Sequence, residues 1–351
     1  MDTRAATRAD ETAARTDGET TDPESSDTGG MDTAAIDTDI SGRTALVTGG
    51  AGFVGSHVAR ALAGDNEVRV LDDLSTGRAA NVPESATLYE GDLLDEELLA
   101  EAMAGADLVF HQAGLVSVPK SVERPVESNR VNVGGTLAVL EAAREVDARV
   151  VLASSVAVFG SPESVPIAED HPTDPASPYA TDKLSIDHYA RVYNRLYDLE
   201  TVVLRYFNVY GPGQSGGQYA GVVRTFLDQA ESGGPLTVEG DGAQTRDFVH
   251  VADVVRANLA AATTDHVGEA FNVGTGESVT VRELADLIVD ATDADAEVVH
   301  VDPRPGDIRR SRADPSKAEE LLGFAPRVDL EDGLRQLARR RSSVEADASP
   351  N

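Results

Sequence analysis

The sequence predicts an α/β fold with a doubly wound parallel sheet at its centre and a smaller mixed C-terminal domain. Between residues 44 and 205, short apolar runs of strand length alternate with segments of helical periodicity. The runs are continuously apolar, which is typical of parallel strands covered by helices on both faces. A glycine-rich stretch joins the first run to the first helical segment, as in many folds of this class.

Six apolar runs are predicted to be buried strands, and segments with helical spacing lie between most of them. The predicted strands are residues 44–48, 68–71, 86–89, 108–111, 150–153 and 202–205. The predicted helices are residues 53–63, 98–103, 133–146, 219–230, 251–262, 281–291 and 315–322. After Tyr206 the alternation loosens, and glycine and proline gather at residues 211–213 and 232–235. We therefore expect a second domain beyond this point.

The composition excludes several classes of protein. The 351 residues carry 61 Asp and Glu against 30 Lys and Arg, a formal net charge of 30 − 61 = −31. A surface of this sign repels phosphates, which argues against nucleic acid as a partner. No apolar stretch approaches the roughly 18 residues of a membrane helix, and the N-terminus lacks an apolar signal segment. We therefore expect a cytoplasmic protein without a membrane partner. Because there is no cysteine, disulfides, thiolate metal sites and cysteine nucleophiles are excluded, and we predict no metal site.

The cations are almost all arginine, since Lys120, Lys183 and Lys317 are the three lysines of the chain. High acidity with so few lysines resembles the proteins of salt-loving archaea, and we expect a halophilic source. In molar salt the Debye length falls to about 3 Å, so that the self-repulsion of an acidic surface is screened.

The stretch over residues 44–55 has the form of a phosphate-binding loop. Gly49, Gly52 and Gly55 lie between a predicted strand and a predicted helix. Glycine permits the tight turn, the close approach of backbone N–H groups to a pyrophosphate and the close packing of helix on sheet. Asp72 ends the next strand, where an acid accepts hydrogen bonds from the adenine ribose and repels a 2′-phosphate. The pattern favours NAD over NADP.

The domain boundaries follow from these motifs and from composition. Residues 1–40 hold almost no large apolar side chains and are predicted to be a disordered acidic tail. Residues 41–205 are predicted to form an NAD-binding Rossmann domain, to which residues 240–265 return. Residues 206–338 are predicted to be mainly a substrate-binding domain, and residues 339–351 a second disordered tail.

Tyr179 and Lys183 are candidates for a catalytic pair. They are four residues apart on a predicted helix, so they share one of its faces. A phenol with a pKa near 10 is a poor base, but a neighbouring ammonium stabilises the phenolate. Ser155 follows a buried strand, and we expect it at the carboxyl edge of the sheet, where it can hydrogen-bond a reacting hydroxyl.

The glycine loop, Asp72, Ser155 and the Tyr179/Lys183 pair, in this order, resemble the extended short-chain dehydrogenase/reductase family. The loop is similar to the T-G-x-x-G-x-x-G form of that family, and the resemblance covers about residues 43–338. Within the family the chain is most similar to NAD-dependent nucleotide-sugar epimerases. Further matching stretches are residues 111–114, 132–136, 205–212, 246–250, 272–274 and 304–307.

The resemblance implies the remaining site residues. Its cofactor site would add Phe53, Val54, Asp92 and Leu93, with Lys183 also on the nicotinamide ribose. The substrate would be a nucleotide-diphosphate sugar. The residues that would bind it are Lys120, Ser155, Asn208, Arg246 and Arg304. Arginine suits a diphosphate because its guanidinium offers a fork of donors. The family also implies a homodimer, through helices near residues 133–146 and 179–197. We interpret His250 as a packed structural histidine.

The resemblance implies epimerisation at C4 through a transient 4-keto sugar, on UDP-glucose, UDP-galactose or an N-acetyl or uronate analogue. Related dehydratases and decarboxylases place acids directly after the catalytic Ser or Thr, where this chain has Val156 and Ala157. A nucleotide-sugar dehydratase or reductase is the alternative, and a non-catalytic dinucleotide-binding protein a more remote one. The chain departs from the usual pattern at Phe159, where Tyr is common, and at Asp182, where Ser is common.

Overall fold

The computed structural model describes residues 40–216, 221–304 and 306–348. Apart from its last residue, the predicted acidic tail over residues 1–40 lies outside the described residues. In the described part of the chain, no helix is both long enough and apolar enough to cross a membrane.

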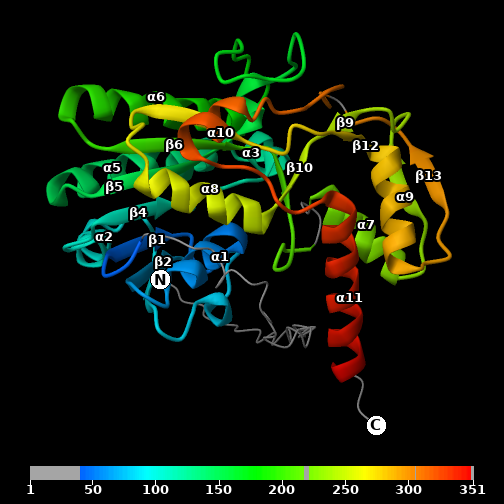
Figure 1. Cartoon of the computed structure of the whole chain (residues 1–351), viewed down its shortest axis with the longest axis horizontal. Coiled ribbons are helices and arrows are strands. Elements are labelled where there is room, and N and C mark those ends of the chain that lie inside the picture. The colour runs from blue at the N-terminus through cyan, green and yellow to red at the C-terminus, as the bar shows by residue number, and fades with distance from the viewer. Residues whose placement is uncertain (1–39, 217–220, 305, 349–351) are drawn as a thin grey trace, which may run out of the picture.

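Seven parallel strands form the central sheet in the order β11-β6-β5-β4-β1-β2-β3 (Figure 1). Their bounds are β1 (Thr44–Thr48), β2 (Glu67–Asp72), β3 (Thr87–Glu90), β4 (Leu108–His111), β5 (Arg149–Ser155), β6 (Thr201–Tyr206) and β11 (Glu269–Val273). The strand order reverses direction between β1 and β4, and in such sheets ligands bind in the crevice outside the carboxyl ends at this switch point. The predicted α/β fold with a parallel sheet is confirmed.

The seventh strand, β11, is absent from the strands that we predicted. It pairs with β6, with Phe271 opposite Leu204, at an edge of the sheet. Its five residues begin with a charged residue and contain Asn272, so that its longest apolar run is two residues. Its place in the sheet depends on pairing with a strand more than sixty residues earlier, which local sequence does not reveal.

Helices cover both faces of the sheet, as Figure 1 shows. Helices α1 (Phe53–Leu62) and α8 (Val251–Thr263) pack against each other on one face. Helices α2 (Glu96–Met103), α5 (Gly135–Val146) and α6 (Pro178–Tyr197) pack on the other. Helix α8 also packs on β5 and β6, so a late segment of the chain completes the layer begun by α1.

A smaller mixed region follows β6 and has a core of its own. Its helices are α7 (Val222–Glu231), α9 (Val281–Thr292) and α11 (Leu330–Ala348), while α10 (Ser316–Leu322) packs back on β11. Three two-stranded sheets pair β7 (Asn208–Tyr210) with β10 (Phe248–His250), β8 (Leu236–Glu239) with β13 (Val298–Val301), and β9 (Thr245–Arg246) with β12 (Val279–Thr280). Phe226, Leu284 and Leu334 are fully buried between these elements.

The predicted disordered tail over residues 339–351 is wrong for most of its length, because α11 continues to Ala348. The reason is tertiary. Arg341 donates to Asp228 at 2.6 Å and also pairs with Glu231, both on α7. These ion pairs hold the helix against a segment more than a hundred residues earlier, and the polar composition of the tail gives no sign of them.

Candidate active site

The glycine-rich loop between β1 and α1 is lined by backbone. Gly49 has a φ of +68°, and a Cβ there would lie 2.6 Å from the amide nitrogen of Ala113. A Cβ on Gly55 would lie 2.2 Å from the carbonyl oxygen of Gly49. Any side chain at these two positions would therefore displace the loop, as expected where backbone must approach a ligand closely.

The start of α1 is suited to an anion. Gly52 occupies the N-cap position and supplies no side-chain cap, and the first turn carries no acidic residue. The first N–H groups of the helix are thus left for a ligand, and the helix dipole favours negative charge there. Phe53 and Val54 are the first helical residues and are half-buried. These residues fit the pyrophosphate of a dinucleotide.

Asp72 lies at the end of β2, buried beside this loop. One carboxylate oxygen accepts from the amide of Ala51 at 2.9 Å, and the other accepts from the amide of Leu74 at 2.9 Å. The carboxylate therefore holds the glycine loop against β2. Each oxygen retains a lone pair, so the group can still accept from a ribose hydroxyl.

Asp92 and Leu93 follow β3, and their environments differ. Asp92 accepts from the amide of Leu94 at 3.0 Å and pairs with Arg130 at 2.9 Å. These two contacts, that of Leu94 foremost, hold the pKa of Asp92 below its ordinary value. Leu93 packs against α5, where a Cβ on Gly135 would lie 2.9 Å from it. Sequence reasoning missed Arg130, which lies in a π-helical turn, η3 (Arg130–Gly134).

The structure brings Ser155, Tyr179 and Lys183 together at the carboxyl edge of the sheet. Ser155 ends β5, and α6 begins beside it after Ser177, whose side chain accepts from the amide of Ala180 at 3.1 Å. Tyr179 and Lys183 are buried on the inner face of α6, and the ammonium lies 5.9 Å from the centre of the phenol ring. This is the arrangement that their four-residue spacing predicts.

Burial has the opposite effect on the pKa values of Tyr179 and Lys183 from that of their neighbouring polar and charged groups. Burial raises the pKa of Tyr179, and a hydrogen bond with Ser155 lowers it. Burial also lowers the pKa of Lys183 to about 8, while the charges of Asp187 and Asp182 raise it. Its Nζ donates to the carbonyl of Ala153 at 2.8 Å. A phenol buried in this way needs a nearby cation to ionise, and Lys183 supplies one.

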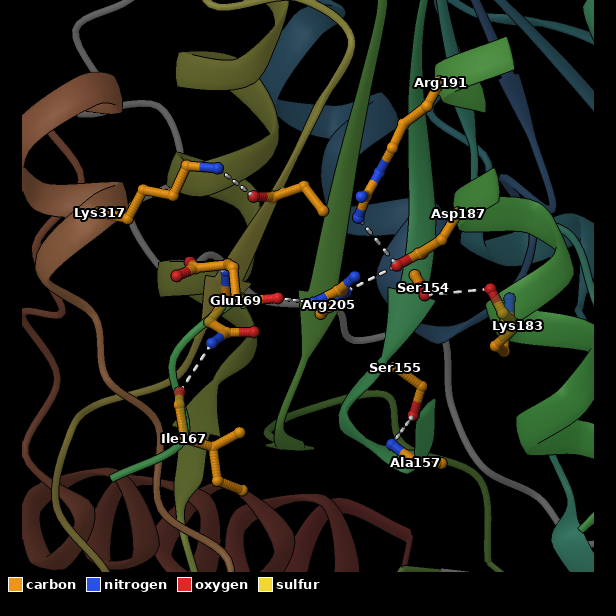
Figure 2. A network of polar contacts seen from close by, with 12 residues as sticks. Ser154, Ser155, Ala157, Ile167, Glu169, Lys183, Asp187, Arg191, Arg205 and Lys317 are labelled. Atoms are coloured by element: carbon orange, nitrogen blue, oxygen red, sulfur yellow. Dashed lines mark hydrogen bonds and ion pairs between the residues drawn. The ribbon is translucent and has the colours of Figure 1, made fainter. Parts of the chain in front are cut away.

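The turn after Ser155 has no group that exchanges protons. Val156 and Ala157 lie in a 3₁₀ turn, η4 (Val156–Phe159), and the amide of Ala157 donates to the Ser155 hydroxyl at 3.2 Å (Figure 2). The hydroxyl is thus oriented by backbone. An additional acid or base at this point, which a dehydration would use, is missing from the described turn.

Behind Lys183 lies a buried ion pair that the sequence did not indicate (Figure 2). Asp187 on α6 accepts from Nε of Arg205 on β6 at 2.6 Å, and both side chains are almost fully buried. Arg205 also donates to the carbonyl of Glu169 at 2.9 Å, and its guanidinium lies 5.0 Å from the ring centre of Phe159. The pair therefore ties α6 to the sheet beside the candidate catalytic residues.

Two of the predicted substrate residues, Arg246 and Arg304, lie near each other in the C-terminal region. Arg246, on β9, has a side chain 12% exposed and pairs with Asp307. Arg304 follows β13, has a side chain 63% exposed and donates to Glu239 at 2.8 Å. Burial chiefly lowers the pKa of Arg246, and the charge of Arg304 adds to this. Each guanidinium is thus paired with a carboxylate.

The other two, Asn208 and Lys120, are half-buried. Asn208 begins β7 and donates to the carbonyl of Asp247 at 2.8 Å. Lys120 lies on α3 (Val118–Glu123), whose Ser121 accepts from the amide of Tyr179 at 3.2 Å. The helix of Lys120 therefore borders Tyr179, whereas Asn208 belongs with the segment that leads to Arg246.

His250 is structural, as the sequence analysis holds. Its Nδ1 accepts from the amide of Ala252 at 3.2 Å and so caps α8. Its ring packs edge-on against Tyr210, and burial lowers its pKa to about 3. A neutral imidazole in this position is a helix cap.

Comparison with known proteins gives consistent matches. The model of the NAD dependent epimerase/dehydratase family matches residues 45–274. A putative UDP-glucose 4-epimerase of Methanocaldococcus jannaschii is 40% identical over 296 residues, which cover 83% of this chain and 96% of the relative.

Two solved structures are similar over nearly their whole length. The UDP-N-acetylglucosamine 4-epimerase of Methanobrevibacter ruminantium, in complex with UDP-N-acetylmuramic acid, has a TM-score of 0.82 at 36% identity and covers 87% of this chain and 99% of its own. The UDP-glucose 4-epimerase of Thermus thermophilus, in complex with NAD, has a TM-score of 0.79 at 40% identity and covers 84% of this chain and 98% of its own.

The loop geometry makes a test of the cofactor site possible. We expect Gly55→Ala to weaken NAD binding at least about tenfold, because the new Cβ must displace the Gly49 carbonyl and with it the phosphate-binding turn. The measurement is calorimetric titration of the folded protein with NAD. Gly64→Ala is the matched control, since a Cβ there meets no atom within 4 Å. Equal affinities in the two variants would contradict the assignment of this loop.

Proposed function

The chain belongs to the NAD-dependent epimerase/dehydratase family, and from that premise we propose that it is a nucleotide-sugar 4-epimerase. The observation that carries the proposal is the placement of Ser155, Tyr179 and Lys183 together, beside a turn without a further acid or base. The substrates in view are UDP-glucose and UDP-galactose or their N-acetyl or uronate analogues.

The residues of the glycine loop fit NAD. Gly49, Gly52 and the start of α1 would hold its pyrophosphate, and Asp72 its adenine ribose. We extend this set to Phe53, Val54, Asp92 and Leu93 around the same crevice. When bound there, NAD would supply the hydride chemistry at the sugar C4, as acceptor and then as donor, and would be regenerated in each turnover.

The protein's own residues move the proton. Tyr179, as a phenolate, takes the proton of the sugar 4-hydroxyl, with Ser155 hydrogen-bonded between them. Lys183 stabilises the phenolate and would also donate a hydrogen bond to the nicotinamide ribose. After the 4-keto sugar has turned in its pocket, Tyr179 returns the proton to the oxygen at C4. The residues thus start and end each cycle in the same protonation state.

The diphosphate of the substrate would be bound by Asn208, Arg246 and Arg304, and Lys120 would border the sugar. The two guanidinium groups support this proposal because they lie close enough to influence each other and because each is paired with a carboxylate. In this arrangement residues 41–205, with the return over 240–265, form the cofactor domain. Residues 206–338 mainly bind the sugar nucleotide.

The family also includes dehydratases, and a net reductase would use the same scaffold. Val156 and Ala157 count against dehydration, because removing water from the sugar needs an acid or base beside the serine. A non-catalytic dinucleotide-binding protein is disfavoured by the intact Tyr179/Lys183 pair. Release of reduced cofactor or formation of a deoxy-keto product would identify these alternatives by absorbance.

The proposed reaction is tested by incubation with UDP-glucose, UDP-N-acetylglucosamine and UDP-glucuronate in molar KCl, followed by NMR of the anomeric protons. We expect the C4 epimer of at least one of them. Tyr179→Phe should lower kcat at least about 100-fold, because the general base is lost. Tyr189→Phe is the matched control, since that side chain is on the same helix and exposed. No epimer from any substrate, or full activity in Tyr179→Phe, would refute the proposal.

We propose a homodimer that forms through the outer faces of α5 and α6. In the described residues, all large exposed apolar side chains except Val301 lie in residues 116–126 and 189–197, next to or on α6. We expect Leu196→Glu to shift the protein toward the monomer in light scattering, because it places a charge within this apolar face. Val301→Glu, on the C-terminal region, should not. A wild-type protein that is monomeric would overturn the proposal.

We also propose a halophilic source and a cytoplasmic location. Cell fractionation would check the location.

The net charge of −31 supports adaptation to salt. We expect the melting temperature to rise by about 5 °C or more between 0.1 and 2 M KCl, because screening removes self-repulsion. Sorbitol at equal osmolality is the control, since it leaves the repulsion in place. An unchanged melting temperature in KCl would count against this adaptation.

A further inference from the structure

Asp182, which directly precedes Lys183, is a buried carboxylate that the mechanism above does not use. Its side chain is 3% exposed near the start of α6. Ser128 donates to one oxygen at 2.6 Å, and Asn129 donates to the other at 3.0 Å. Asn132 donates to the first oxygen at 3.3 Å. These donors lie on α4 (Pro125–Asn129) and the π-helical turn η3, so Asp182 joins both to α6.

All three donors of Asp182 are neutral, in contrast to the surroundings of the other buried acid of α6. Asp187 accepts from Arg205 at 2.6 Å, and Arg191 lies 3.9 Å away. The charge of Asp187 is therefore balanced by arginine. The charge of Asp182 has no such partner among its hydrogen-bond donors, and the cation beside it is Lys183.

The strands around Lys183 supply no negative charge that could take the place of the Asp182 carboxylate. His111 on β4 is fully enclosed between Thr48 and Thr136, and burial lowers its pKa to about 3, so it is neutral. Strand β5 presents Ser154 and Ser155, and β6 presents Arg205, which is engaged with Asp187.

The helices that pack on α6 add no second counter-charge. On α5, Glu141 and Arg144 contact each other and the tyrosines of the distal half of α6. On α3, the charged side chains are Lys120, which is half-buried, and Glu123, which is exposed. On α4, Glu127 pairs with Arg124, and Arg130 of η3 pairs with Asp92. Asp187 and Asp182, in this order, are thus the carboxylates whose charges raise the pKa of Lys183.

Asp182 also fixes the backbone around Lys183 through Asn132. The Asn132 amide oxygen accepts from the amide of Leu115 at 2.8 Å, and its nitrogen donates to the carbonyl of Leu115 at 3.2 Å. A Cβ on Gly114 would lie 2.8 Å from this oxygen and 3.6 Å from Nζ of Lys183. The loop after β4 therefore passes directly beside the ammonium, and Asp182 orients the asparagine that holds it.

We propose that Asp182 is a positioning residue of this site, whose buried carboxylate keeps the Lys183 ammonium charged and holds the π-helical turn against α6. Its catalytic consequence rests on the proposed epimerase function, while its electrostatic effect concerns the protein alone. Without the carboxylate, burial lowers the pKa of Lys183 further below its usual range. The amine then becomes neutral at a lower pH and no longer stabilises the Tyr179 phenolate.

The test is a direct titration of Lys183 in the NAD-bound protein. The chain has three lysines, so ¹³C-labelled lysine gives three NMR signals, which Lys120→Arg and Lys317→Arg assign. We expect Asp182→Asn and Asp182→Ser each to lower the titration midpoint of Lys183 by about one pH unit. In the plot of kcat against pH, the midpoint of the alkaline limb should move to lower pH by the same amount, and KM should not change.

Asp198→Asn is the matched control. Asp198 is exposed at the C-terminal end of the same helix, in the left-handed conformation that asparagine tolerates. It lies about 22 Å from Lys183 along the helix axis, more than a Debye length away, so that salt screens its charge from the ammonium. The midpoint of Lys183 should not move in this variant.

The outcomes separate the two proposals. An unchanged midpoint of Lys183 in both Asp182 variants, or a failure of both to fold, would overturn the electrostatic role of Asp182. A shifted midpoint in a protein that epimerises none of the sugars would leave the role of Asp182 in place and refute the proposed function. Loss of stability without any shift of the midpoint or the pH profile would show a structural role alone.

Discussion

Much of this structure depends on keeping a charged lysine enclosed by protein. Lys183 is 4% exposed, and burial lowers its pKa to about 8 even though the charges of Asp187 and Asp182 raise it. The ammonium donates to the carbonyl of Ala153, and the charges of Asp187 and Asp182 stabilise it, but each buried carboxylate in turn needs partners. Asp187 therefore requires Arg205, and Arg205 requires the carbonyl of Glu169. Because buried ion pairs contribute little net stability, we interpret this set as fixing the position of α6 rather than strengthening the fold.

The parallel sheet determines where that lysine can act. Since all seven strands run in one direction, the residues that follow β1, β2 and β5 meet at a single edge. Gly49, Asp72 and Ser155 come from these three strand ends, although more than a hundred residues separate the first from the last. The start of α6 adds Tyr179 beside Ser155. The proposed dinucleotide site and the proposed proton-transfer site are thus adjacent because of strand order, and the proposed reaction needs both.

Local features of the fold and of the candidate site could be predicted from the sequence, whereas features that depend on tertiary contacts could not. The runs at 44–48 and 108–111 coincide with β1 and β4, because buried parallel strands carry a continuous apolar pattern. The Tyr179/Lys183 pair was predictable since four-residue spacing fixes a helix face. The Asp187–Arg205 pair was not, because it joins a helix to a strand and shows no periodicity. The same holds for β11, and for the last turns of α11, which depend on Arg341 meeting α7.

An acidic enzyme that binds an anionic substrate must overcome repulsion at the site itself. Here Arg246 and Arg304 are held by Asp307 and Glu239, so the proposed diphosphate site is neutral before the substrate arrives. A diphosphate presents several charged oxygens to both guanidinium groups at once, whereas each carboxylate serves one of them. In molar salt, screening limits charge interactions to about 3 Å, so that contacts at hydrogen-bond distance outweigh the distant surface. The surface charge of −31 and an anionic substrate are therefore compatible, provided that recognition is confined to such direct contacts.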